Sequence, residues 1–167
     1  MTGGCIRYSL ADMALKLTRY IRPECFLHDL TEKTREDALR RIIHEAAAKG
    51  LIKDEGELFS KLMERENIQT TAVGNGIAIP HCFTDEISDL VIIVARAPAG
   101  LEFDSFDGKP TQVVFLLMGN RQEHSLHLKA LARIARLIKS TRFIERIISA
   151  ESVQDMVRAF DEEEAKI

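Results

Sequence analysis

Two uninterrupted apolar runs near the middle of the chain restrict the fold more than any other feature. Residues 90–95 read LVIIVA, and residues 113–118 read VVFLLM. Both runs are short and rich in β-branched side chains, which is typical of strands buried on both faces of a sheet. The sequence DGKP at residues 107–110 is a turn signal. We therefore expect the two strands to pair with each other as in a β-hairpin.

Helical patterns flank these strands on both sides. Thr34, Asp54 and Ser152 each precede an apolar stripe with helical spacing and have an acidic residue three positions later, as at helix starts. After the second strand, another stripe is formed by Leu128, Leu131, Ala132, Ala135 and Ile138. Helices, then strands, then helices predict an α/β fold, a three-layer α/β sandwich in which helices flank a mixed β-sheet.

Composition narrows the class of protein. A chain of 167 residues with 46% hydrophobic residues suits one globular domain. The net charge of -3 leaves no broad basic field for nucleic acid. No apolar run approaches the roughly 20 residues of a membrane span, and residues 1–8 lack the apolar core of a secretion signal. Three scattered cysteines favour a reducing compartment, so we expect a cytoplasmic protein.

His81 is the strongest candidate among five histidines. It follows the turn at residues 74–76, a short apolar run at residues 77–79, and Pro80. This order places its side chain on a rigid scaffold at the end of a sheet, where sites tend to lie. An imidazole has an ordinary pKa of about 6.5, so a neutral ring is available at pH 7 to attack phosphorus and to leave again. From the residues alone, a plain turn histidine is an equally good interpretation.

Two other chemistries stay open at this point. His124 and His127 share a helix face, because residues three apart are neighbours on a helix. Together with His81 they predict, as a minor alternative, a zinc-dependent hydrolase, although a pair of histidines alone is a weak zinc signal. Cys82 is a possible nucleophile, but its plain interpretation is a small, partly buried thiol.

The octapeptide GNGIAIPH, residues 74–81, resembles the active-site segment of the fructose/mannitol/nitrogen-regulatory class of phosphotransferase-system enzyme IIA domains. The surrounding sequence agrees with this class. Arg65 stands upstream, FDSFDGKP at residues 103–110 resembles the turn between two family strands, and HLKALARIARLI at residues 127–138 resembles the helix with the second histidine. The resemblance implies an EIIA type-2 domain over residues 17–163, preceded by a flexible extension at residues 1–16.

The resemblance also implies roles for individual residues. His81 matches the phosphorylated histidine, His127 the second active-site histidine, and Arg65 the arginine that stabilises the phosphoryl group. Further donors to the phosphoryl group are expected from the hydroxyls or backbone N–H groups of Thr70, Thr71, Gly74, Asn75 and Gly76.

The implied function is that of a phosphotransferase component, a phosphohistidine carrier. It accepts a phosphoryl group from a histidine phosphocarrier protein (HPr-like) and passes it to a IIB component, and neither a metal nor another cofactor is required. The alternative is a nitrogen-regulatory module whose phosphorylation state controls binding to target proteins.

The chain departs from the family pattern at two places. Ala72 stands where glycine is common, and Cys82-Phe83 stands where many members have a small residue followed by a basic one. The first departure concerns the turn and removes no reactive group. The second puts in doubt a charge contact just beyond His81, but not the carrier role.

Overall fold

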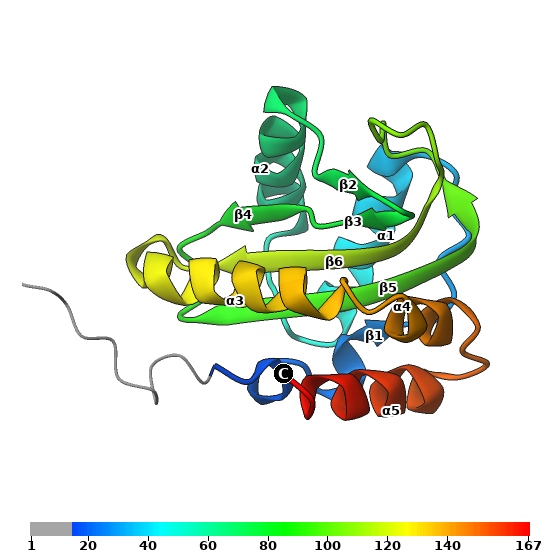
Figure 1. Cartoon of the computed structure of the whole chain (residues 1–167). Helices are drawn as coiled ribbons and strands as arrows, with labels where there is room; N and C mark the ends of the chain where they lie inside the picture. Colours follow the sequence, from blue (N-terminus) through cyan, green and yellow to red (C-terminus); the bar gives the residue numbers. More distant parts are fainter. Residues whose placement is uncertain (1–14) are drawn as a thin grey trace, which may run out of the picture.

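A computed structural model describes residues 15–167, so most of the predicted extension at residues 1–16 lies outside the described residues. Within this range a mixed, six-stranded sheet lies between helices (Figure 1). Helices α1 and α2 pack behind the sheet in the view of Figure 1, and α3 and α4 pack in front of it. Helix α5 packs against α4 and the edge strand β1. The predicted α/β sandwich is confirmed.

The two apolar runs form the centre of the sheet. They belong to β5 and β6, which pair antiparallel as the predicted hairpin, while β1 pairs with β5, and β3 and β4 pair with β6, in parallel. The sheet order is β1-β5-β6-β3-β2, and β4 also pairs with β6. The strands are β1 (Phe26–Leu27), β2 (Ala72–Gly74), β3 (Ile77–Ala78), β4 (His81–Phe83), β5 (Leu90–Leu101) and β6 (Thr111–Gly119).

Strands β3 and β4 are one extended segment that is interrupted at Pro80. Ile77 pairs with Val113 and His81 with Leu117, so the register along β6 is unbroken on both sides of the proline. Pro80 has no N–H to donate, but its carbonyl oxygen accepts the N–H of Leu117 at 2.9 Å. The segment therefore stays straight along β6 and brings His81 to the start of β4.

Helices begin where the sequence signals them. The side chains of Thr34, Asp54 and Ser152 each accept the backbone N–H three residues later, at 3.2, 3.0 and 3.1 Å. The helices are α1 (Arg35–Ala48), α2 (Glu55–Ile68), α3 (His124–Leu137), α4 (Thr141–Ile148) and α5 (Val153–Glu164), with short 3₁₀ turns at Leu17–Arg19, Pro23–Cys25 and Arg121–Glu123. Among residues 15–167, no helix combines the length and the apolarity needed to cross a membrane.

The apolar stripe that the sequence displays along α3 is not the buried face of this helix. Leu128 is 52% exposed, Ala132 and Ala135 are also exposed, and Leu131 and Ile138 are only half-buried. The buried residues of α3 are instead His127, Ala130, Arg133, Ile134 and Leu137. Two polar side chains therefore occupy the inner face, and a search for apolar periodicity alone rotates the helix away from them. One consequence is an apolar ridge on the outer face of α3.

Arg133 turns inward because it meets a buried carboxylate at the end of α5. Its Nε lies 3.5 Å from Glu164, which is 2% exposed and also accepts the backbone N–H groups of Leu17 and Thr18. Burial raises the pKa of Glu164, against the opposing effects of the Leu17 N–H and of Arg133. This cluster joins α3 and α5 to the segment that precedes β1.

We expect Glu164→Ala to lower the free energy of unfolding by roughly 3–5 kcal/mol, because it leaves Arg133 and two backbone donors buried without their acceptor. Chemical denaturation measures this change. Glu162→Ala is the matched control, since Glu162 pairs with Arg146 at 2.6 Å on the surface and the loss of an exposed pair costs about 0–1 kcal/mol. Equal losses in the two variants would contradict a structural role for the buried cluster.

Candidate functional site

His81 lies at the start of β4 with its imidazole half-buried. Its Nδ1 is 2.8 Å from the carbonyl oxygen of Ile79. A carbonyl oxygen only accepts hydrogen bonds, so in the neutral ring Nδ1 carries the proton and Nε2 keeps a free lone pair. The backbone two residues upstream therefore selects the tautomer that leaves Nε2 as the nucleophile.

His127 meets His81 on the same face of the sheet. Successive residues of a strand point to opposite faces, so His81 and Phe83 face α3 while Cys82 faces α2. The ring of His127, in the first turn of α3, has its centroid 5.7 Å from that of His81. The structure thus brings together the two histidines that the sequence singled out.

The imidazole of His127 is 2% exposed, and neither of its ring nitrogens has a hydrogen-bond partner. Leaving a buried polar group unpaired costs about 1–3 kcal/mol, and native structures tolerate this mainly where the group has a task. Burial, together with the smaller effects of the nearby His81 and His124, lowers the pKa of His127 to about 4. At pH 7 the ring is neutral, with one nitrogen able to donate and the other able to accept.

Two residues whose role sequence analysis missed, Gly119 and Phe83, pack against the imidazole of His127. Gly119 pairs with Phe83 at the end of β6, and a methyl group at Gly119 would lie 2.9 Å from Nδ1 of His127. The ring of Phe83 lies 4.4 Å from that of His127 and 5.5 Å from that of His124, centroid to centroid. The available signal for Gly119 was a glycine that ends a buried strand, and for Phe83 it was the departure from the family pattern.

Arg65 lies in the last turn of α2. Its guanidinium donates to the carbonyl oxygen of Gln69 at 2.9 Å, where the chain leaves α2. The N–H of Ile79 donates to the carbonyl oxygen of Thr71 at 3.0 Å, so the segment that follows Arg65 runs beside the residues that lead to His81. The approach of Arg65 to His81 stays a prediction.

The predicted hydroxyl donors are used elsewhere in the fold. Thr71 donates both its backbone N–H, at 3.0 Å, and its hydroxyl to the carboxylate of Glu66, which is 2% exposed. The hydroxyl of Thr70 donates to the carbonyl oxygen of Phe103 at 2.9 Å. These hydroxyl protons fasten β2 to the end of α2 and to the loop after β5, and their support of a phosphoryl group stays a prediction.

The turn at Gly74, Asn75 and Gly76 lies further along the same segment, away from His81. The three residues have positive φ angles and form the bend between β2 and β3, and the N–H of Asn75 is already donated to Asp107 at 2.9 Å. Five extended residues then lead from Gly76 to His81, a distance of about 16 Å. The turn builds the hairpin that positions the segment, and it does not reach the histidine.

Neither of the other two chemistries fits the geometry. Among the described residues, no group of three or more His, Cys, Asp or Glu side chains is arranged to hold a metal ion. His81, His124 and His127 therefore form no zinc-hydrolase site, and Phe83 contacts the rings of the latter two. Cys82 is buried on the opposite face of the sheet, and burial raises the pKa of its thiol to about 12. Its thiolate is scarce at neutral pH, which argues against a nucleophilic role.

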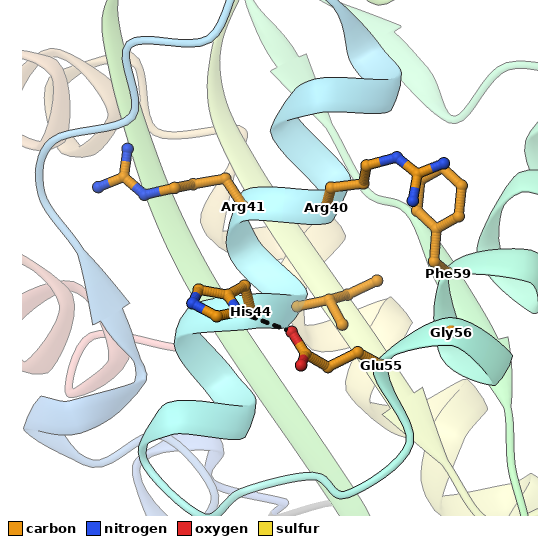
Figure 2. Close-up of a pocket in the computed structure, with 7 residues that line it drawn as sticks. Arg40, Arg41, His44, Glu55, Gly56 and Phe59 are labelled. Atoms are coloured by element: carbon orange, nitrogen blue, oxygen red, sulfur yellow. Dashed lines mark hydrogen bonds and ion pairs between the residues drawn. The ribbon is translucent and has the colours of Figure 1, made fainter.

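A separate cavity of about 390 Å³ lies between α1 and α2 (Figure 2). The guanidinium of Arg40 covers the ring of Phe59 at 3.8 Å, and Nδ1 of His44 lies 2.9 Å from Glu55. Helices α1 and α2 pack on the face of the sheet opposite to His127, and the cavity shares no residue with the His81 site. It is therefore not part of that site.

The α/β sandwich and the sequence of residues 19–163 place the chain in the enzyme IIA class of phosphoryl carriers. The chain belongs to the EIIA 2 family of the phosphoenolpyruvate-dependent sugar phosphotransferase system, whose model matches residues 19–163.

Named relatives come from both branches of this class. The chain is 34% identical over 140 residues to a nitrogen regulatory protein of Bradyrhizobium diazoefficiens, which covers 84% of this chain and 91% of the relative. It is 33% identical over 121 residues to the fructose-specific EIIA component of Haloferax volcanii, which covers 72% and 79%. The fold matches the crystal structure of the nitrogen regulatory protein IIA-Ntr from Neisseria meningitidis with a TM-score of 0.79 at 19% identity, over 86% and 98% of the two chains.

We expect Gly119→Ala to displace the ring of His127, because its new methyl group would lie 2.9 Å from Nδ1. Overpacking of this kind costs about 1–3 kcal/mol of folding free energy. Denaturation and the imidazole NMR signals of His127 measure the two effects. Gly56→Ala is the matched control, since its methyl group meets nothing closer than 3.8 Å. Unchanged His127 signals in Gly119→Ala would contradict the close packing of Gly119 against the imidazole.

Acid should destabilise the protein through His127. The folded state holds this ring neutral down to about pH 4, whereas the unfolded chain takes up the proton near pH 6.5, so stability falls as the pH drops between these values. Between pH 7.5 and pH 4.5 the loss attributable to this group is about 2–3 kcal/mol. Denaturation of the wild type and of His127→Gln at both pH values measures this loss, which should be absent from the variant. The exposed His44, as His44→Gln, should keep the wild-type dependence on pH.

Proposed function

We propose that Nε2 of His81 accepts a phosphoryl group from a histidine phosphocarrier protein (HPr-like) and passes it to a IIB component. The observation that supports this most directly is the hydrogen bond between Nδ1 of His81 and the carbonyl oxygen of Ile79, which leaves Nε2 unprotonated. Membership of the EIIA 2 family supports the same chemistry.

The transfer needs no cofactor in this proposal. The lone pair of Nε2 attacks the phosphorus of the donor, the bond from phosphorus to the donor nitrogen breaks, and that electron pair returns to the donor imidazole. In the second half, a nucleophile of the IIB component attacks the same phosphorus, and the electron pair of the broken bond returns to Nε2 of His81. The proton stays on Nδ1 throughout and is donated to the carbonyl oxygen of Ile79.

His127 and Arg65 supply the positive ends of hydrogen bonds in this scheme. Charge in phosphoryl transfer is spread over the equatorial oxygens, so donors placed there stabilise the transition state. The unpaired ring N–H of His127 is one such donor. Arg65 adds a planar fork when its guanidinium turns from the Gln69 carbonyl oxygen towards the phosphoryl group. The cost of leaving His127 unpaired is thus recovered in the phosphorylated state.

The outer face of α3 supports docking of a protein partner. Leu128, next to His127, is 52% exposed, and the apolar ridge continues along the helix to Ala135 and Ile138. There it meets a cavity of about 590 Å³ between α3, α4 and the turn that joins β2 to β3. An exposed apolar surface beside a nucleophile suits a partner that must cover the site and keep water from the phosphorus.

A regulatory output is the second candidate function. The relatives include a nitrogen regulatory protein at 34% identity beside a fructose-specific component at 33% identity, so similarity favours neither branch. In this version His81 is phosphorylated in the same way, and its phosphorylation state controls the binding of a target protein to the α3 face. We place either activity in the cytoplasm, where the free thiols of Cys25 and Cys82 stay reduced.

The test is to incubate the pure protein with phosphoenolpyruvate, enzyme I and the histidine phosphocarrier protein, and to determine its mass at neutral pH. We expect the gain of one acid-labile phosphoryl group in the wild type, none in His81→Asn, and an unchanged gain in the control His44→Asn. Subsequent loss of the group on addition of a IIB component favours transport over regulation. No gain with active carrier proteins, or a gain that survives His81→Asn, would contradict the proposal.

A further inference from the structure

We propose that Phe83 is a positioning residue: its ring holds the imidazole of His127 over Gly119 and towards His81, and it keeps water away from that imidazole. This inference rests on the proposed carrier function, in which His127 donates to the phosphoryl group. It concerns a position where the sequence departs from the family pattern.

Packing alone sets the orientation of the His127 ring. Neither ring nitrogen is hydrogen-bonded, so no carboxylate or carbonyl oxygen selects its tautomer or its rotation. The ring of Phe83 lies 4.4 Å from it at an interplanar angle of 39°, and Gly119 lies so close that a single added methyl group would be 2.9 Å from Nδ1.

Phe83 also lies beside both the buried histidine and the exposed one. The centroid of its ring is 4.4 Å from that of His127 and 5.5 Å from that of His124, which is exposed. The strand fixes this arrangement, because Phe83 pairs with Gly119 and points to the same face as His81. Removal of the ring would connect His127 to solvent from the side of His124.

Two consequences follow for the chemistry of the site. A hydrated His127 would regain an ordinary pKa and rotate between several orientations, so the donor to the phosphoryl group would no longer be held in place. Water would also approach the phosphorus of phosphorylated His81 from the side that the ring now covers. Both the basicity of His127 and the lifetime of the phosphohistidine should therefore depend on an aromatic ring at position 83.

Four variants test this inference. Phe83→Leu and Phe83→Met keep an apolar side chain but remove the ring, Phe83→Tyr keeps the ring, and Phe106→Leu is the control, because Phe106 is 80% exposed. NMR titration of the unphosphorylated proteins gives the pKa of His127, and the decay of the isolated phosphoproteins gives the lifetime. We expect the pKa to rise by at least one unit, and the lifetime to fall at least fivefold, in both ringless variants, with wild-type behaviour in Phe83→Tyr and Phe106→Leu.

An unchanged pKa of His127 in a folded ringless variant would overturn the inference, and so would a raised pKa with an unchanged lifetime. The use of both Leu and Met means that one poorly folded variant does not decide the result. The titration is measured without phosphorylation. A failure of the wild type to accept phosphoryl would therefore contradict the proposed function separately, whatever the titration of His127 shows.

Discussion

Parallel pairing between residues 77–83 and β6 is the interaction on which the site depends. The unbroken register carries the chain straight past Pro80, whose carbonyl oxygen accepts the N–H of Leu117. This pairing sets three relationships at once. It turns His81 and Phe83 to the α3 face, it places Phe83 beside Gly119, and it holds the carbonyl oxygen of Ile79 where Nδ1 of His81 donates to it. The nucleophile and its surroundings thus follow from one strand register.

A second constraint is the burial of polar groups on the inner face of α3. His127 and Arg133 both point inward, but only Arg133 has a charged partner. Arg133 finds a carboxylate at Glu164, which ties the helix to the start and the end of the described chain. His127 finds no partner and is held neutral by its surroundings. The same helix is therefore anchored at one end by a buried ion pair and presents an unpaired imidazole at the other, beside the nucleophile.

Sequence reasoning reached the sheet and the pair of histidines but not the residues that shape their environment. The strands around residues 90–95 and 113–118 and the three helix caps depend on local patterns, which the sequence displays directly. The rotation of α3 was missed because its buried positions include a histidine and an arginine, whose burial depends on partners far along the chain. The turn at Gly74 was assigned to the site because it is adjacent in the motif, although an extended strand separates it from His81. The contacts of Gly119 and Phe83 arise only where β4, β6 and α3 meet.

The central claim is that the backbone holds His81 with its proton on Nδ1, so that Nε2 receives the phosphoryl group beside a neutral His127. Long-range ¹H–¹⁵N correlation of the histidine side chains at pH 7, before and after phosphorylation, tests it most directly. The predicted result is a Nδ1–H tautomer for His81, a neutral ring for His127, and phosphorus coupling at Nε2 of His81 after transfer. A Nε2–H tautomer for His81, or phosphorus coupling at its Nδ1, would contradict the claim.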